Sequence, residues 1–218
     1  MNSFDLSKHT VVNKSIPKNA FDKYTNTKQK KLFVDIVSKI KWAYKISKET
    51  INLSGKEIKE IQVFEIQLHK KDAKISALLD IIDKSIPYHI VFVLTHANST
   101  MLSVSKKHPH ATNDDNSVID WTFKSDWIKQ SEFHYRLALK ESIDSVFSDI
   151  CFQISGKQKQ GIDLKQLIEK EQTIKELKNE IQKLGNEITR SKQFNNKVDL
   201  NLKLQTLKQE LDEFLIQN

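Results

Sequence analysis

Seven-residue spacing of leucine and isoleucine dominates the last quarter of this 218-residue chain. One stretch runs from Leu167 to Ile188 and a second from Leu200 to Phe214, each with apolar residues at the first and fourth heptad positions. Such spacing places an apolar stripe along a helix, as in a coiled coil. Each stretch covers only about two to three heptads, so each needs a partner on which to bury its stripe. The predicted partner-binding residues are Leu167, Ile174, Leu177, Ile181, Leu184, Ile188, Leu200, Leu204, Leu207, Leu211 and Phe214.

The two stretches are out of phase by two residues, which leaves two structures open. Either the chain reverses near Asn195-Asn196 to form an antiparallel hairpin, or one long helix carries a discontinuity. Paired asparagines favour a turn, whereas the lack of Gly and Pro there opposes one. The stripe could be buried by the other stretch, by a second copy or by another protein.

The preceding sequence has the mixed periodicity of an α/β domain. A strand over 60–69, a helix from Asp72 to before Ile86-Pro87 and an apolar strand over 88–95 make a strand–helix–strand unit, so these strands should be parallel with a right-handed crossover. The other expected elements are helices over 27–47 and 142–154, strands over 101–106, 118–124 and 133–139, and a polar loop over 107–117. We therefore expect a mixed-sheet α/β domain over 1–155, a glycine-bracketed linker over 156–161 and a helical arm over 162–218.

The excess of positive over negative charge is confined to one end of the sequence. Residues 1–50 hold 11 lysines and 4 acidic residues, which accounts for the whole net charge of +7. A localised basic region is typical of a protein that binds a polyanion, most often nucleic acid. The alternative is a lysine-rich surface without a ligand. The arm is neutral, with 10 cationic and 10 acidic residues over 163–218, which favours a protein partner there.

A tryptophan lies on the basic face of the first expected helix. On a helical wheel that continues to residue 48, Trp42 lies roughly opposite the apolar stripe beside Lys31 and Lys45, with Lys41 and Lys48 towards one flank. An aromatic ring among lysines can stack on a base while the ammonium groups hold phosphates. These five are the candidate nucleic-acid-binding residues. The alternative is that Trp42 packs in the interior.

Other candidate chemistry is sparse. Glu65-x-Gln67 loosely resembles the half-motif of restriction-endonuclease-like nucleases, which need a second acid on a preceding strand for Mg²⁺. His108-Pro-His110 with Asp114-Asp115 could form a metal cluster, but a solvated loop is the preferred explanation because the ligand spacing is unsupported. We predict no catalytic residue, no metal site and no cofactor.

The cellular compartment follows from simple features. Cys151 is the only cysteine, so no intrachain disulfide can form, and it is expected in the core of the 142–154 helix. No apolar run is long enough to span a bilayer, and the first ten residues lack a signal-peptide pattern. We expect a cytoplasmic protein that does not associate with membranes.

Five segments together resemble an uncharacterised prokaryotic family, domain of unknown function 4391: Phe33–Lys45, Thr50–Leu53, Glu60–Phe64, Ile86–Phe92 and Gln193–Asn201. The resemblance covers most of the chain. It implies an association with helicases and DNA methyltransferases of restriction or phage-defence systems, and it brings no catalytic residues.

Two functions from different classes follow. The first is a non-catalytic accessory subunit whose arm docks on a helicase, a methyltransferase or a second copy, with nucleic acid as a further candidate partner of the basic region. The second is a metal-dependent nuclease that uses Glu65.

Overall fold

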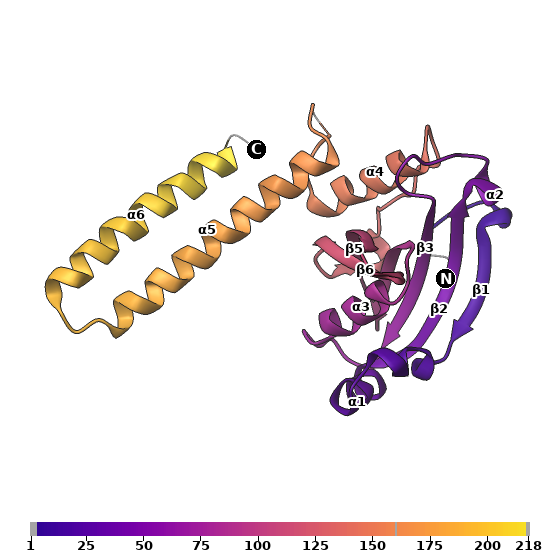
Figure 1. Cartoon of the computed structure of the whole chain (residues 1–218), viewed down its shortest axis with the longest axis horizontal. Helices are drawn as coiled ribbons and strands as arrows, with labels where there is room; N and C mark the ends of the chain where they lie inside the picture. Colours follow the sequence, from indigo (N-terminus) through magenta and orange to yellow (C-terminus); the bar gives the residue numbers. More distant parts are fainter. Residues whose placement is uncertain (1–3, 160, 217–218) are drawn as a thin grey trace. The chain divides into compact units, whose positions relative to one another are not determined.

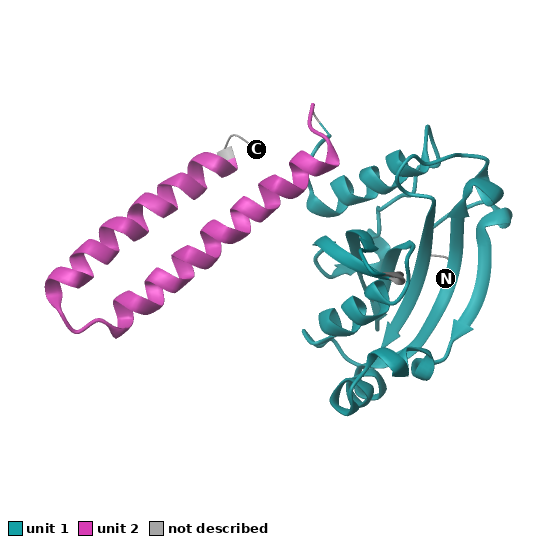
Figure 2. Cartoon of the chain, in the orientation of Figure 1, with its two compact units in different colours: residues 1–160 teal, residues 161–218 magenta. Residues whose placement is uncertain are grey.

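The computed structural model describes residues 4–159 and 161–216, and of residues 113–115 and 216 it describes the backbone alone. The chain divides into two compact units, residues 1–160 and 161–218 (Figure 2). The first is built on a mixed seven-stranded sheet and the second is a pair of helices (Figure 1). The predicted fold class is therefore confirmed, and of the two structures open for the arm the hairpin is the one found.

The first unit follows the order η1 (Lys8–Thr10), β1 (Val11–Ile16), η2 (Lys18–Tyr24), α1 (Thr27–Ile36), β2 (Val37–Ser47), α2 (Lys48–Ile51), β3 (Glu60–Leu68), α3 (Ile75–Lys84), β4 (His89–His96), β5 (Ser99–His110), β6 (Asn113–Lys124), β7 (Ile128–Lys129), η3 (Gln130–Glu132) and α4 (Ile143–Ser155). The sheet runs β1-β2-β3-β4-β5-β6, and β7 pairs with β5. The pair β3 and β4 is parallel, as predicted, with α3 as its crossover. All other pairs are antiparallel.

Helices cover both faces of the central strands. On one face, Phe64 of β3 and Phe92 of β4 are buried in a cluster that includes residues of α1 and α3, such as Ile36 and Leu78. The opposite face meets α4, whose Phe147 ring lies 4.6 Å from the ring of His89. Strand alternation thus sends even-numbered residues of β3 and β4 towards α1 and α3, and odd-numbered ones towards α4.

The helix expected over 27–47 is wrong in its second half. Only α1 is helical, opened by a capping box in which Asn26 and Gln29 bond reciprocally. The chain then becomes β2, and a register shift between Trp42 and Tyr44 places one extra residue, Ala43, in the strand. This bulge and a second register shift between Val37 and Lys39 change which face is buried, so the buried positions repeat at spacings of three and four, as on a helix. The β-branched and aromatic content of 37–46 is the signal that favours a strand.

The polar loop expected over 107–117 is also wrong, because β5 and β6 continue through it to a turn at residues 111 and 112. Cross-strand polar contacts hold the extension, such as His108 Nδ1 to Asp120 Oδ1 at 2.7 Å. Lys107, which seemed a loop lysine, is buried. The many polar residues of 107–117 therefore belong to the end of a β-hairpin rather than to a loop.

Two smaller expectations differ from the structure. Residues 133–140 form no strand, since the backbone N–H and C=O of Arg136 pair with the side-chain amide of Gln153 on α4 instead of a neighbouring strand. The helix expected from Asp72 begins at Ile75, and the Asp72 carboxylate accepts a hydrogen bond from the N–H of Lys74 in the preceding turn. The helix expected over 142–154 is confirmed as α4, with Ser142 as its N-cap.

The second unit consists of α5 (Leu164–Arg190) and α6 (Phe194–Ile216). Asp163 and Gln166 form a capping box at the start of α5. The chain reverses at residues 191–193, slightly before the expected Asn195-Asn196, which lie in the first turn of α6. None of the described helices combines the length and apolar character needed to cross a membrane.

Candidate functional site

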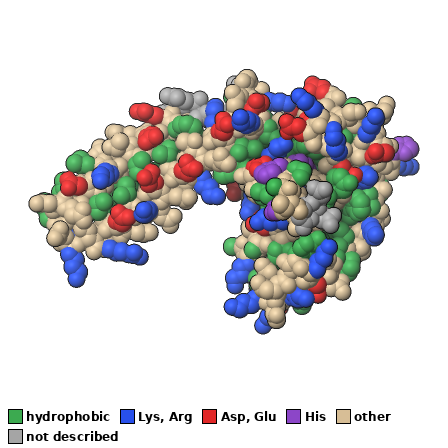
Figure 3. All heavy atoms as spheres, viewed as in Figure 1, with side chains coloured by type: hydrophobic (Ala, Val, Ile, Leu, Met, Phe, Trp, Pro, Cys, Tyr) green, Lys and Arg blue, Asp and Glu red, His purple; other side chains and the backbone are tan. Residues whose placement is uncertain are grey.

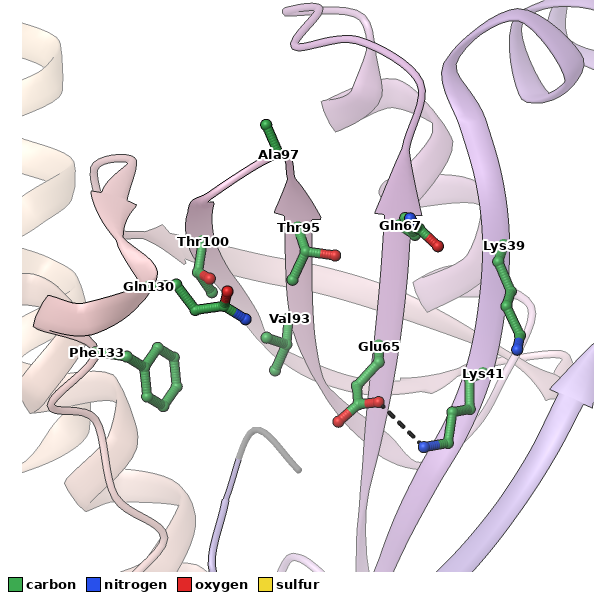
Figure 4. A pocket seen from close by; sticks show the side chains of 10 residues that line it. All are labelled: Lys39, Lys41, Glu65, Gln67, Val93, Thr95, Ala97, Thr100, Gln130 and Phe133. Carbon is green, nitrogen blue, oxygen red and sulfur yellow. Dashed lines mark hydrogen bonds and ion pairs between the residues drawn. The ribbon is translucent and has the colours of Figure 1, made fainter. Parts of the chain in front are cut away.

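The sheet carries a cavity of about 390 Å³ on the face that also meets α4 (Figure 4). Along β3 this face changes character: Ile61 and Val63 are buried, whereas Glu65 and Gln67 line the cavity. The lining residues are Lys39, Lys41, Glu65, Gln67, Val93, Thr95, Ala97, Thr100, Gln130 and Phe133. The cavity therefore lies at the carboxyl-terminal halves of the parallel strands β3 and β4.

Strand register brings the polar groups of the cavity together. Lys41 of β2 is the cross-strand partner of Glu65, which in turn pairs with Val93 of β4. Lys41 Nζ and a Glu65 carboxylate oxygen lie 3.3 Å apart, and both side chains are partly shielded from water. Lys39 lies two residues before Lys41 on β2 and opposite Gln67, and its ammonium group makes no ion pair within the described residues. Figure 4 shows both lysines on one side of the cavity.

The opposite wall comes from the segment after β7. Gln130 is fixed by the hydrogen bond from its backbone N–H to the carbonyl of Asn98 at 3.0 Å. The ring of Phe133 packs edge-on against Phe4 and Tyr135, each at 5.7 Å between ring centroids. Phe133 and Gln130 thus stand on a supported segment and face the lysines across the cavity (Figure 4).

This cavity offers a poor donor set for a divalent cation. Among the described residues that line it, only Glu65 has a carboxylate, and the neighbouring strand β2 presents Lys39 and Lys41 where a nuclease would need an acid. A cation next to Glu65 repels Mg²⁺, which prefers several oxygen ligands. Among the described side chains no group of three or more His, Cys, Asp or Glu residues could hold a metal ion. The side chains of Asp114 and Asp115, expected beside His108 and His110, lie outside the described residues.

The candidate nucleic-acid-binding residues do not share one surface. Lys41 projects into the cavity, while the indole of Trp42 packs on the opposite face, 6.4 Å from the ring of Phe64 between centroids. The indole N–H also donates to the carbonyl of Tyr44. The grouping of these residues by a helical wheel was wrong because the segment is a strand, whose neighbours point to opposite faces.

The remaining candidate lysines differ in their surroundings. Lys45 Nζ lies 3.1 Å from a carboxylate oxygen of Glu60. That contact raises the pKa of Lys45 above its ordinary value. Lys31 on α1 and Lys48 on α2 are exposed. Part of the positive charge of residues 1–50 is thus balanced by acids of β3.

The eleven apolar residues of the two heptad stretches form the seam of the hairpin. Every one is buried or half-buried, with Leu167 at 1% exposure the most shielded. The two stretches therefore shield much of their stripe within one chain, as antiparallel helices do. The arm does not need a partner to cover this seam.

A second apolar row on α6 was missed by the heptad analysis. Phe194, Val198 and Leu202 are spaced by four residues and are 78%, 42% and 59% exposed. Residues four apart lie on one side of a helix, and this row points away from the seam formed by Leu200, Leu204 and Leu207. Figure 3 shows apolar side chains at the surface of the hairpin. The spacing of these residues could have revealed the row had α6 been searched for a second stripe.

Comparison with known proteins gives a family and no activity. A search of curated proteins and a search of solved structures each found no match. The family model described as "Domain of unknown function (DUF4391)" matches residues 4–211. The match includes both the α/β unit and nearly all of the hairpin. The chain therefore belongs to this family, as the five sequence segments indicated.

Proposed function

We propose that this protein is a non-catalytic interaction subunit of a cytoplasmic DNA-processing complex of restriction or phage-defence type. In this proposal the helical hairpin is the docking arm. The observation that carries it is the exposed row Phe194, Val198 and Leu202 on α6.

The row is a stronger signal than scattered surface hydrophobics. Single exposed apolar residues are common on proteins, but three on one helical side within about two turns form a continuous strip. The seam residues are already shielded within the hairpin, so the row is not needed to join α5 to α6. A helix that offers apolar anchors at i, i+4 and i+8 fits a hydrophobic groove of a partner protein. The neutral charge of the arm supports a protein partner rather than nucleic acid.

The DNA-processing context rests on other grounds. The sequence resemblance implies a helicase or a DNA methyltransferase as the partner, with a second copy as the remaining option. The excess of lysine in residues 1–50 supports an additional contact with nucleic acid, for which Lys31 and Lys48 are the exposed candidates. A contact with phosphates would weaken steeply as salt rises.

The test is co-purification of the tagged full-length protein from its native host, with the wild type compared with Phe194→Ser/Val198→Ser/Leu202→Gln. The proposal expects the wild type to bring down a stoichiometric helicase or methyltransferase, or a second copy, and the triple variant to lose it. Asn201→Ser/Lys203→Gln, which changes exposed polar residues of the same helix, should retain the partner. A partner retained by the triple variant would overturn the assignment of this surface. DNA cleavage by the purified protein with Mg²⁺ or Mn²⁺ would favour the nuclease instead.

A further inference from the structure

Polar side chains at the centre of a sheet need an explanation, and the cavity contains several. β3 and β4 are inner strands, and their even-numbered residues from Phe64 to Leu68 and from Ile90 to Leu94 are apolar. On the other face the same strands change from Ile61, Val63 and Val91 to Glu65, Gln67 and Thr95. Inner strands covered on both faces are normally apolar throughout. Here Gln67 is exposed and Glu65 and Thr95 are half-buried, so this part of the face is open to water and to a ligand.

The charge of the cavity favours an anion. Lys39 and Lys41 both line it, and within the part of the chain that the structure describes Glu65 is the only acid that does so. Because Glu65 neutralises Lys41, the positive charge of Lys39 is left without a counter-charge within the described chain. An oxyanion between the two ammonium groups would balance the charge of Lys39, with Lys41 shared between the oxyanion and Glu65. Phosphate, with several acceptor oxygens, suits two such point charges.

The wall opposite the lysines suits a planar ring. Phe133 of this wall and Val93 of the neighbouring strand β4 supply apolar surface, and the side-chain amide of Gln130 also lines the cavity (Figure 4). Amides both donate and accept hydrogen bonds, and so do the hydroxyls of Thr95 and Thr100. Such groups beside an aromatic ring can hold the polar edge and the face of a heterocycle. The volume of about 390 Å³ lies in the range for small-molecule sites.

The rim carries a strained residue. Ala97, in the turn between β4 and β5, has a φ of +48°, a conformation that L residues with a Cβ adopt rarely. Backbone strain of this kind concentrates at binding sites, where the surrounding structure holds it in place. The hydrogen bond from Gln130 to Asn98, the next residue, ties this turn to the opposite wall.

We propose that the cavity binds one nucleotide unit, with the phosphate between Lys39 and Lys41 and the base against Phe133. The unit is either a free nucleoside monophosphate or the phosphorylated end of a single strand, which share this chemistry. This inference stands on the α/β unit and does not depend on the partner of the arm.

Isothermal titration of the full-length protein is the test, with inorganic phosphate, ribose 5-phosphate, the four nucleoside monophosphates and a 5′-phosphorylated hexanucleotide as probes. At least one nucleotide or the hexanucleotide should saturate one site, at least about tenfold more tightly than inorganic phosphate. Tighter binding of the hexanucleotide assigns a strand end, and tighter binding of a monophosphate assigns a free nucleotide. Absence of saturable binding by every probe, or equal affinity for inorganic phosphate, would overturn the proposal.

Matched variants locate the binding. Lys39→Gln should weaken it about tenfold or more, as expected from loss of one charge-assisted contact. Lys28→Gln makes the same change on the exposed surface of α1 and should leave affinity unchanged. Phe133→Leu should reduce the preference for nucleotide over ribose 5-phosphate, and its thermal transition shows whether the fold is intact. Equal losses in Lys39→Gln and Lys28→Gln would show non-specific attraction and refute the site.

Discussion

The ammonium nitrogen of Lys107 lies 2.7 Å from Oδ1 of Asp83, and both side chains are at most 2% exposed. Lys107 also donates to the carbonyls of Asp83 and Ile86, so all three of its protons have acceptors. Burial raises the pKa of Asp83 and lowers that of Lys107, while the attraction between them opposes both shifts. The pair fastens β5 to the end of α3 and to the loop before β4.

Lys107→Met should lower the free energy of unfolding by about 3–5 kcal/mol, because it leaves the Asp83 carboxylate buried without a counter-charge. Urea denaturation followed by circular dichroism measures the loss. The double variant Lys107→Met/Asp83→Leu should recover part of it, since no unpaired charge remains. A single-variant loss below about 1 kcal/mol would show that water reaches the pair.

The stability of the α/β unit should fall in mild acid because of His89. Burial, reinforced by the positive charges of Lys107 and Lys106, lowers the pKa of His89 to about 3, and its Nε2 is buried without a hydrogen-bond partner in the described structure. The unfolded chain binds this proton near pH 6.5 and the folded chain does not. The contribution of the neutral His89 to the free energy of unfolding is therefore fully present above pH 6.5 and is lost as pH falls towards 3.

At pH 5 the free energy of unfolding should be about 2 kcal/mol lower than at pH 7.5 because of His89. Urea denaturation of the wild type and His89→Phe at both pH values measures it. The variant removes the titrating group, so its stability should change less between the two values. Equal pH dependence in both proteins would contradict the assignment.

Asp144 at the start of α4 should be a major stabilising residue. Its carboxylate accepts hydrogen bonds at 2.5, 3.0 and 2.9 Å from the backbone N–H groups of Lys56, Glu57 and Ile58. Burial opposes its ionisation, but these bonds prevail and lower its pKa. Asp144→Ala should lower the free energy of unfolding by about 2–3 kcal/mol, because it leaves these backbone N–H donors unpaired. Asp149→Ala on the same helix removes only a surface pair with Lys159 and should cost less than about 1 kcal/mol. Equal losses in the two variants would argue against this role.

The hairpin seam and the outer row of α6 should respond differently to substitution. Leu177→Lys/Leu204→Lys places charges in the seam and should unfold the hairpin. The far-ultraviolet signal at 222 nm would then fall by about half, since α5 and α6 hold 27 and 23 residues against 10, 4, 10 and 13 in α1 to α4. Phe194→Ser/Val198→Ser/Leu202→Gln should keep the signal. A helical signal unchanged by the seam variant would contradict the hairpin.

Sequence reasoning succeeded where one periodicity extends over many residues. The parallel pair β3 and β4 and the two heptad stretches are of this kind, because a repeating pattern reports which face is buried. It failed at β2, where two register shifts, between Val37 and Lys39 and at Ala43, give a strand the burial spacing of a helix. It also failed at Lys107, whose partner Asp83 lies 24 residues away and has the pattern of a surface acid on a helix.

The cavity shows a different limit of sequence reasoning. Glu65 and Gln67 were noticed as a polar pair on a strand, but their surroundings come from segments far apart in the chain. Lys39 belongs to β2, Thr95 to β4 and Phe133 to an irregular segment. No local pattern predicts that these residues meet, because strand order and register bring them together.

The most direct measurement of the central proposal is the dissociation constant between the full-length protein and its purified partner, by titration calorimetry at fixed salt. The account predicts that Phe194→Ser/Val198→Ser/Leu202→Gln weakens binding about 100-fold or more, since buried apolar anchors carry most of the energy of such interfaces. Asn201→Ser/Lys203→Gln should stay within about threefold of the wild type, as near-neutral contacts at an interface rim do. A triple variant that binds as tightly as the wild type would contradict the account.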